Sequence, residues 1–288
     1  MSSESAAGEG GGKLLVVATP IGNLDDLTLR AIDALKTCDR VAAEDTRRTR
    51  QLLSHLGISG KPIDALHAHS SERDVAKLVE RLAGGETIAL ATDAGTPAVS
   101  DPGDALVKGA IAAGITVVPI PGASAVLAAL VASGLATGAG FRFVGFLPRE
   151  GAARRDAVAL VCATAEPLVM FESPERTAAT LAELADAMPD RAACVARELT
   201  KLHEEIVRGT LKDLAAPREW RGEIAIVLGA WSPDTRADAI DDAAIDTRID
   251  RELEGGGHAK TIADAIAAWS GRPRREIYER VVRRKNER

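Results

Sequence analysis

Three short segments that combine glycine with proline follow strand-like apolar runs in the first half of the chain. The runs are Leu14–Ala18, Thr87–Ala91 and Ile115–Val118, and the segments near or after their ends are Thr19–Leu24, Asp93–Pro97 and Pro119–Ser124. Continuous apolar runs of this length are typical of buried parallel strands. Ligands of open α/β sheets bind beyond the carboxyl ends of the strands, where glycine permits close backbone approach and proline fixes the loop. The three loops therefore predict one shared pocket, although each loop alone is also compatible with an ordinary tight turn.

The composition excludes several classes of protein. A net charge of -6 and an aromatic content of 3% disfavour a protein that coats nucleic acid or relies on stacking platforms, so any nucleic-acid contact must be local. The cysteines Cys38, Cys162 and Cys194 are isolated, and no apolar run reaches 18 residues. This pattern indicates a cytoplasmic protein with reduced thiols rather than a secreted or membrane protein.

The organisation along the chain predicts two α/β domains and a tail. Strand and helix patterns alternate from Lys13 to about Val131, which predicts a parallel sheet with right-handed crossovers. After the glycine-rich stretch 134–140, five strand candidates share only two long helices, which predicts a mixed or largely antiparallel sheet. These candidates are Phe141–Phe146, Leu168–Phe171, Ala193–Arg197, Glu205–Arg208 and Glu223–Leu228. The expected divisions are a disordered leader (1–12), an N-terminal α/β domain (13–134), a C-terminal α/β domain (135–230) and a tail (231–288).

The tail changes from acidic to basic along its length. Residues 231–257 are rich in aspartate and are expected to form a loose linker, whereas two short helices are expected beyond them. The solvent side of the last helix and the turn before it is expected to carry Arg272, Arg274, Arg275, Arg280, Arg283, Arg284, Lys285 and Arg288. This patch predicts a contact with RNA or the ribosome. The alternative is that the helix neutralises the acidic segment.

The first loop lacks the fingerprint of a dinucleotide site. Thr19–Leu24 contains one glycine, and neither GxGxxG nor GxxxxGK[ST] occurs there. A pyrophosphate cradle is therefore disfavoured, and the loops suit a compact, mostly uncharged ligand held by backbone groups and a few hydroxyls.

An ordered set of motifs carries a family resemblance. In chain order these are Thr19–Leu24, Ala43–Arg47, Thr92–Pro97, Asp101–Gly103, Pro121–Gly122, Gly145–Pro148 and Ala196–Lys201. The set closely resembles the ribosomal RNA small subunit methyltransferase I family, a branch of the tetrapyrrole methylase superfamily, from about Lys13 to Gly229. The tail after Trp231 is similar to the small C-terminal helical region of that family, less distinctively.

The resemblance implies a fold, a cofactor and a substrate. It implies a two-domain tetrapyrrole-methylase-like fold, S-adenosylmethionine as methyl donor, and a homodimer with the donor in a cleft between the two domains. The implied reaction is methylation of the ribose 2'-hydroxyl of cytidine 1402 in the decoding region of 16S ribosomal RNA. Donor contacts of the superfamily would correspond to Pro20, Gly22, Asp93, Gly95, Thr96, Val99, Gly122, Ser124, Met170, Phe171, Ala196, Glu223 and Ile224.

Two other functions remain open at the level of sequence. One is methylation of a tetrapyrrole of the precorrin type, which the Thr-Pro-Ile-Gly-Asn-Leu sequence of the first loop disfavours. The other is a non-catalytic RNA-binding factor in ribosome assembly. The basic tail is unnecessary for the tetrapyrrole reaction.

The chemistry of the implied reaction suggests catalytic candidates. A ribose hydroxyl is a poor nucleophile, so a nearby general base helps in-line displacement at a sulfonium. Glu44 and Asp45 follow an apolar strand and are the first candidates, with the alternative that they simply start the next helix. Lys201 is the other candidate base, although a phosphate contact or a solvated charge is the more common role of such a lysine.

Several cations and histidines are candidate RNA contacts. Arg47 and Arg48 follow the two carboxylates and suit a phosphate. His67 and His69 suit RNA better than a metal, because no third ligand has an obvious spacing. Further candidates for the RNA backbone are Arg149, Arg154 and Arg155, with a solvated helix face as the alternative.

Overall fold

The computed structural model describes residues 11–67, 70–98, 103–231, 242–255, 257–270 and 272–286. The chain divides between Ala230 and Trp231 into two compact units, and each is described by itself below. Within the described ranges, no helix combines the length and apolar character that a membrane span requires.

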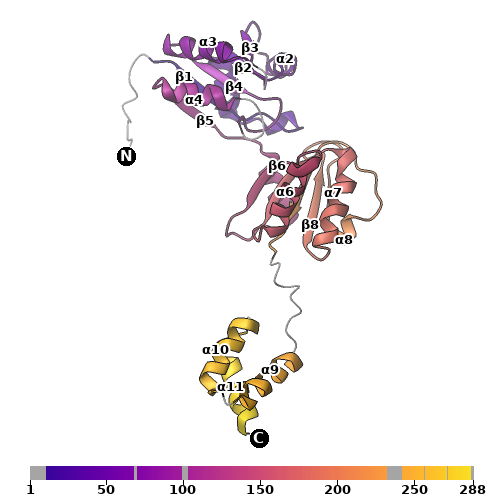
Figure 1. The fold of residues 1–288 in the computed structure, drawn as a ribbon. Coiled ribbons are helices and arrows are strands. Elements are labelled where there is room, and N and C mark those ends of the chain that lie inside the picture. Colours follow the sequence, from indigo (N-terminus) through magenta and orange to yellow (C-terminus); the bar gives the residue numbers. More distant parts are fainter. Residues whose placement is uncertain are drawn as a thin grey trace. The chain divides into compact units, whose positions relative to one another are not determined.

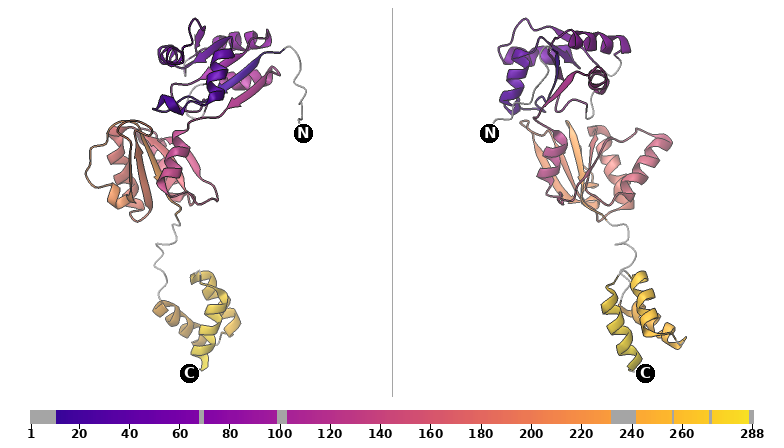
Figure 2. Two further views of the ribbon diagram at one scale, coloured as in Figure 1. Left: turned by 180° about the vertical axis from the view of Figure 1, so that it is seen from behind. Right: turned by 90° about the vertical axis from the view of Figure 1, so that its left-hand side faces the viewer.

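The first unit begins with a parallel five-stranded sheet (Figures 1 and 2). Its strands lie in the order β3-β2-β4-β1-β5, which places β1 and β4 in the middle. Their bounds are β1 Lys13–Val17, β2 Arg40–Ala43, β3 Ile63–Ala65, β4 Ile88–Ala91 and β5 Thr116–Ile120. Leu14 of β1 is in register with both Ile88 and Val117. The parallel sheet predicted from the alternating pattern is thus confirmed, and the edge strand β3 is an addition, because three residues show no readable periodicity.

Helices cover both faces of this sheet. On one face, α1 (Leu29–Thr37) and α2 (Thr46–His55) bury Leu35 and Leu53 against Val41 and Ala89. On the other, α3 (Glu72–Ala83) and α4 (Asp104–Ala112) cover alternate residues of the same strands, including Leu14, Ile88 and Leu90. A single turn of 3-10 helix, η1 (Leu24–Asp26), precedes α1. Both faces are buried, as expected for continuous apolar strands.

The second sheet is mixed, as predicted. Its order is β6-β7-β10-β8-β9, in which only β6 and β7 pair in parallel. The bounds are β6 Arg142–Phe146, β7 Leu168–Glu172, β8 Ala192–Arg197, β9 Glu205–Thr210 and β10 Ile224–Leu228. Each of the five strand candidates from the sequence corresponds to one of these strands, with ends displaced by one or two residues.

Helices also cover both faces of the second sheet. Helix α5 (Ala125–Ser133) follows β5 but packs on the second sheet, where Ala129 and Leu130 contact Val169 and Ala225. Helices α6 (Gly151–Ala163) and α7 (Pro174–Ala187) lie along the opposite face (Figures 1 and 2). The short helix α8 (Leu211–Leu214) packs against α7 and β9. Because α5 begins at the third loop, the chain passes directly from the candidate pocket into the core of the second sheet.

The second unit is a cluster of three helices, which corrects one expectation. Its helices are α9 (Asp242–Glu254), α10 (Ala259–Ser270) and α11 (Arg274–Asn286). The sequence predicts a loose acidic linker through residue 257, but residues 242–254 are helical. Ile245 and Ile249 lie one turn apart and are fully buried in a core shared with Ile262, Ile266 and Ile277, so burial explains the helix.

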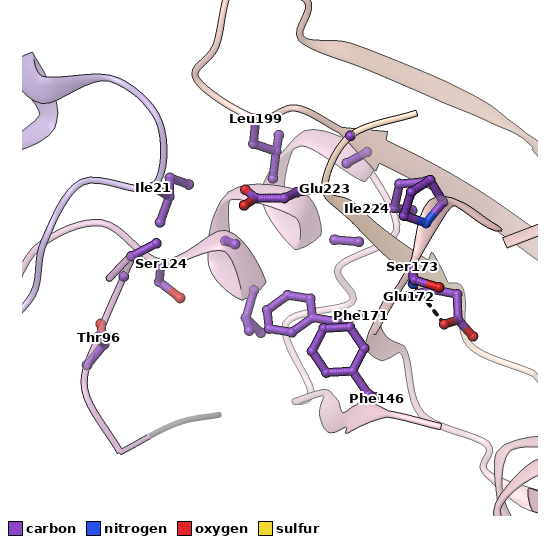
Figure 3. A pocket seen from close by; sticks show the side chains of 18 residues that line it. Ile21, Thr96, Ser124, Phe146, Phe171, Glu172, Ser173, Leu199, Glu223 and Ile224 are labelled. Carbon is purple, nitrogen blue, oxygen red and sulfur yellow. Dashed lines mark hydrogen bonds between the residues drawn. The ribbon is translucent and has the colours of Figure 1, made fainter. Parts of the chain in front are cut away.

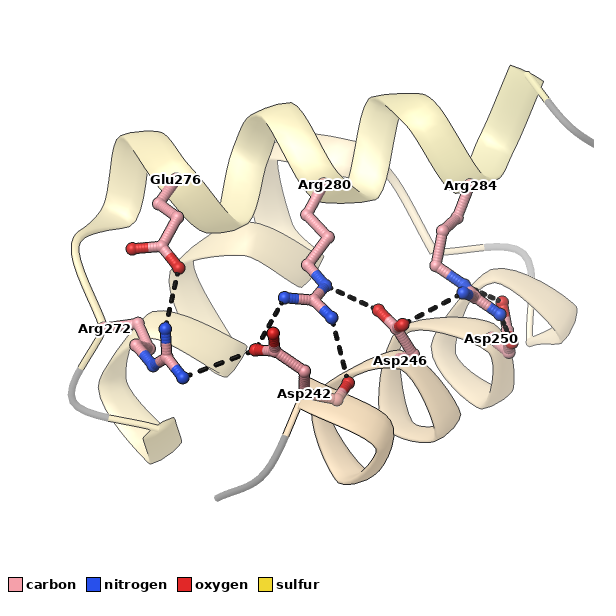
Figure 4. A network of polar contacts seen from close by, with 7 residues as sticks. All are labelled: Asp242, Asp246, Asp250, Arg272, Glu276, Arg280 and Arg284. Carbon is pink, nitrogen blue, oxygen red and sulfur yellow. Dashed lines mark hydrogen bonds and ion pairs between the residues drawn. The ribbon is translucent and has the colours of Figure 1, made fainter. Parts of the chain in front are cut away.

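Most cations of the basic tail are paired within this unit. Asp242, Asp246 and Asp250 lie one turn apart on α9 and face Arg280 and Arg284 of α11 (Figure 4). Arg280 contacts Asp242 at 2.8 Å and Asp246 at 2.6 Å, and Arg284 contacts Asp246 at 3.1 Å and Asp250 at 2.5 Å. Ion pairs also engage Arg272, Arg274 and Arg275. Acids of the segment 231–257 thus pair with Arg272, Arg280 and Arg284, as the alternative to RNA contact expects. Arg274 and Arg275 pair instead with Asp264 and Glu279, and Arg283 and Lys285 are exposed.

We expect the ion pairs between α9 and α11 to make the second unit sensitive to acid. The hydrogen bond from Arg280 lowers the pKa of Asp246. A carboxylate with a lowered pKa stabilises the fold above its ordinary pKa of 3.8, and this stabilisation is lost as the pH falls through the folded value. Asp246→Asn should therefore raise the rate of amide exchange in α9 roughly fivefold at neutral pH, which corresponds to a loss of about 1 kcal/mol in the free energy of opening. The variant should also show a smaller increase in opening when the pH is lowered.

Hydrogen exchange of the full chain, corrected for intrinsic rates, measures this effect. Glu252→Gln is the matched control, because Glu252 is also on α9 but is exposed. Equal protection of α9 in both variants would contradict a role for the ion pairs.

Candidate functional site

The three loops of the first sheet lie together beside the second sheet. They contribute Ile21, Gly95 and Ser124 to the wall of a cavity of about 400 Å³, which is called the first cavity below. Phe171 and Ile224 of the second sheet form part of the facing wall (Figure 3). The sequence prediction that the loops share one pocket is confirmed.

Backbone and side-chain hydrogen bonds join the loops to one another. The amides of Thr19 and Gly95 donate to each other's carbonyl oxygens at 2.9 and 3.0 Å, so the first and second loops form an isolated bridge. Gly95 has a φ of +83°, a backbone conformation that glycine adopts without strain. The hydroxyl of Thr96 donates to the carbonyl of Ala123 at 3.3 Å, and Ser124 caps α5 by accepting from the amide of Leu127. These bonds fix the cavity wall before any ligand binds.

Phenylalanines and a buried ion pair build the facing wall. The ring of Phe171 packs against Phe143 and Phe146 at centroid distances of 5.0 and 5.6 Å. The next residue, Glu172, has a fully buried side chain that pairs with Arg176 at 2.5 Å and accepts from the Thr180 hydroxyl at 2.7 Å. The cation and the hydroxyl compensate the cost of burying this carboxylate.

This network also holds the loop that follows β6. Arg176 donates to the carbonyl of Leu147, and Arg154 donates to the carbonyl of Pro148, both at 3.1 Å. Arg154 additionally pairs with Glu183 at 2.6 Å, and its side chain is only 14% exposed. The prediction that Arg154 contacts RNA is therefore corrected: its guanidinium joins the loop to α7.

A strained turn connects the first loop to the second sheet. Glu198 and Thr200 both have positive φ, at +50° and +66°. Thr200 accepts at Oγ1 from the amide of Asn23 at 3.1 Å, and a Cβ on Gly22 would lie 2.5 Å from Cγ of Lys201. Glycine at position 22 is therefore required by close approach of this turn, not by a phosphate.

A second cavity of about 460 Å³ adjoins the first. Ile21, Ala94 and Glu223 line both cavities, so the two share a boundary. The other residues that line the second cavity are Thr19, Pro20, Gly22, Leu24, Arg48, Thr49, Gln51, Leu52, Thr92, Asp93 and Lys201. The wall of the second cavity thus combines carboxylates, cations and threonines with apolar side chains.

The predicted donor contacts divide between the two cavities. Gly95, Thr96, Ser124, Phe171, Ala196, Glu223 and Ile224 line the first, and Pro20, Gly22, Asp93 and also Glu223 line the second. Met170 is fully buried, and Gly122 packs against Ala18. These two line neither the first nor the second cavity, while Val99 lies outside the described residues.

Neither of the first two candidate bases lines the first or the second cavity. Asp45 is the N-cap of α2 and accepts from the amides of Arg47 and Arg48, and the bond from Arg47 lowers the pKa of Asp45. Glu44 accepts from the amide of Asp93 at 3.4 Å, and Asp93 in turn accepts from the amide of Asp45 at 3.1 Å. The alternative, in which these residues begin the helix, therefore describes Asp45. The carboxylate that reaches the second cavity from this network is that of Asp93.

Lys201 is held as an ammonium ion. Its Nζ lies 2.9 Å from both Glu198 and Glu223. Burial lowers the pKa of Lys201, but hydrogen bonds to Glu198 and Glu223 outweigh burial, and the net shift is upward. A lysine with a raised pKa stays protonated at neutral pH, so this geometry does not support a role as general base.

The remaining substrate candidates are dispersed. Of the arginine pair on α2, Arg48 lines the second cavity and Arg47 is exposed outside both. His67, Arg149 and Arg155 are also exposed and line neither cavity, and His69 lies outside the described residues. Across the described ranges, no group of three histidine, cysteine or carboxylate side chains is placed to hold a metal ion.

Sequence reasoning missed several lining residues. Ile21, Ala94 and Phe146 belong to the recognised motifs but carry no chemistry that would single them out. Thr49 and Leu52 reach the second cavity from α2, one turn apart. Residues three positions apart share one face of a helix, so this spacing in the helix that follows a strand-end motif is a usable signal.

The turn at Gly222 gives a test of how tightly the site is packed. A Cβ at Gly222 would lie 2.4 Å from Cδ of Glu198, and its φ is +82°. Gly222→Ala should lower the free energy of unfolding by roughly 3 kcal/mol, through strain and displacement of Glu198. Gly138→Ala is the matched control, because Gly138 has a φ of +75° with no atom within 4 Å of its Cβ position, and we expect about 1 kcal/mol. Urea unfolding measures both, and equal losses would show that contact with Glu198 is unimportant.

Comparisons with solved structures show the fold. Uroporphyrin-III C-methyl transferase from Thermus thermophilus, complexed with S-adenyl homocysteine, aligns at a TM-score of 0.54 and 23% identity over 76% of this chain and 97% of its own. Diphthine synthase aligns at a TM-score of 0.58 and 18% identity over 76% of this chain and 90% of its own. The first unit therefore has the fold of these transferases.

Sequence comparisons show the family. Residues 13–215 match the model of the tetrapyrrole (corrin/porphyrin) methylases. Ribosomal RNA small subunit methyltransferase I of Halalkalibacterium halodurans is 40% identical over 93% of this chain and 93% of its own, and the protein of that name from Mesorhizobium japonicum is 43% identical over 95% and 92%. The ordered motifs, the paired sheets and the cavity between them thus have one explanation: the chain belongs to the ribosomal RNA small subunit methyltransferase I family of S-adenosylmethionine-dependent methyltransferases.

Proposed function

We propose that this protein methylates the ribose 2'-hydroxyl of cytidine 1402 in 16S ribosomal RNA. The observation that carries the proposal is similarity at about 40% identity along more than nine-tenths of the chain to relatives named for small-subunit ribosomal RNA. The position and the atom come from the resemblance of the ordered motifs. We further propose that it acts as a cytoplasmic homodimer on the RNA of the small ribosomal subunit.

The first cavity suits S-adenosylmethionine in size and chemistry. A volume of about 400 Å³ is in the range of small-molecule sites. Phe146 and Phe171 offer apolar faces to an adenine, and Thr96 and Ser124 offer hydroxyls. The bound donor supplies an electrophilic methyl group on a sulfonium. The role of the chain is to hold the ligand in a cavity whose walls are already fixed by hydrogen bonds.

The second cavity offers groups of both charges to an acceptor. The carboxylates of Asp93 and Glu223 and the cations of Arg48 and Lys201 lie in its wall. A ribose would present hydroxyls that donate to the carboxylates, and a phosphate would be attracted to a cation. The choice of RNA over a tetrapyrrole rests on the relatives named for ribosomal RNA.

Mapping of the methyl group tests the proposed reaction. Purified protein incubated with labelled donor and small subunits that lack the modification should place label in 16S RNA. Primer extension at low nucleotide concentration should then stop at cytidine 1402. Label on another nucleotide would contradict the position, and label only on a tetrapyrrole intermediate would contradict the substrate class.

Donor binding at the first cavity has its own test. Phe171→Ala removes an aromatic wall and should raise the dissociation constant of S-adenosylhomocysteine about tenfold, because burial of such a face contributes on the order of 1.4 kcal/mol. Phe141→Ala is the control, since Phe141 is 40% exposed and lines neither cavity. Calorimetric titration measures both, and unchanged affinity in Phe171→Ala would place the donor elsewhere.

A further inference from the structure

The second cavity adjoins the proposed donor site and can hold a second ligand. We propose that it receives a single nucleotide turned out of the RNA, with Arg48 on the phosphate and Asp93 accepting a hydrogen bond from the ribose hydroxyl. This inference rests on the function proposed above. It assigns the acceptor to particular side chains: Arg48 is a substrate candidate from the sequence, whereas Asp93 is reassigned from the donor to the acceptor.

The position of the cavity is the first argument. Ile21, Ala94 and Glu223 separate it from the first cavity, and no other residue stands in both walls. A group-transfer reaction needs its two reactants within van der Waals contact. An acceptor in the second cavity would therefore face a donor in the first cavity across this boundary alone.

The size and shape of the cavity are the second argument. Its volume is about 460 Å³, and its walls come from the first loop, α2, the end of β4 and the turn at Lys201. This space suits one nucleotide, whereas a base-paired helix is far wider. Enzymes that act on one nucleotide of a paired region extrude it from the stack and bind it in such a pocket.

The distribution of chemical groups is the third argument. Pro20, Leu24 and Leu52 provide apolar surface for a base, and the cavity has both a cation and a carboxylate. Arg48 has a side chain 63% exposed, which places its guanidinium at the rim, where a phosphate is not desolvated. The side chain of Asp93 is 25% exposed and lies deeper. A nucleotide carries the matching groups, a phosphate on the outside and a hydroxyl further in.

Asp93 is oriented for this role by the residues around it. Its Oδ1 accepts from the amide of Asp45 at 3.1 Å, and its Oδ2 lies 3.5 Å from Nη1 of Arg48. An ionised carboxylate accepts hydrogen bonds at both oxygens, so Oδ2 has lone pairs for a ribose hydroxyl. When a phosphate engages Arg48, the contact between Arg48 and Asp93 would weaken, which leaves Oδ2 of Asp93 to the hydroxyl.

A substitution that fills the second cavity is the decisive experiment. Leu24 is 43% exposed and lines only the second cavity, so Leu24→Trp should lower the rate of methylation of small subunits roughly 100-fold. S-adenosylhomocysteine should bind with unchanged affinity in calorimetric titration, which also shows that the variant is folded. Leu29→Trp is the matched control, because Leu29 is 81% exposed and lines neither cavity.

The results separate this inference from the proposed function. If the wild-type protein methylates 16S RNA and Leu24→Trp does so at the same rate, the second cavity does not hold the acceptor. If Leu24→Trp loses donor affinity in parallel with activity, the two cavities are not separate sites and the inference is wrong. If the wild-type protein transfers no methyl group to 16S RNA, the proposed function fails and this inference fails with it.

Two charge substitutions test the roles of the side chains. Arg48→Ala should weaken binding of small subunits about tenfold and reduce the slope of log Kd against log salt by about one, as for one lost phosphate contact. Arg50→Ala, an exposed change on the same helix, should leave both nearly unchanged. Asp93→Asn should lower kcat roughly 100-fold with little change in either binding constant. A normal salt slope in Arg48→Ala, or a normal kcat in Asp93→Asn, would remove that residue from the proposal.

Discussion

The contact between the first loop and the turn that ends in Lys201 is the constraint on which both cavities depend. Gly22 lies so close to Lys201 and Thr200 that no side chain fits, and the Asn23 amide donates to Thr200. The turn reaches this position only because Glu198 and Thr200 adopt left-handed backbone conformations. Strain of this kind persists where surrounding structure over-determines it, and here Glu198 is held by the amide of Glu223 and by Lys201.

Around this contact, each wall is stiffened by a different type of interaction. The loops of the first sheet are joined by backbone hydrogen bonds, as between Thr19 and Gly95. The wall from the second sheet depends on the buried pair of Glu172 and Arg176, which also holds the loop after Phe146. A preorganised site needs little reordering when ligands bind, and this lowers the entropic cost of binding.

The second unit shows that ion pairs within a fold can account for part of a charge pattern in the sequence. A run of arginines in an acidic protein suggests a nucleic-acid contact, but Arg280 and Arg284 complete a set of ion pairs with acids that lie thirty-four or more positions earlier. The pairing depends on α9 being a helix with aspartates one turn apart. Its helicity depends in turn on Ile245 and Ile249 finding a shared core.

Local patterns in the sequence determined the succession of strands and helices along the chain and the parallel or mixed character of the two sheets. They also determined that three loops meet at one edge. These follow from periodicity and from backbone rules that act over a few residues. Tertiary structure alone decided which side chains face the cavities. Asp45 and Asp93 are both acids at strand ends, yet one caps a helix and the other lines a cavity, because direction depends on the helix that follows and on packing between sheets. Lys201 and Arg154 likewise acquire partners from distant segments, and those partners, which no local pattern reveals, determine their charge and their role.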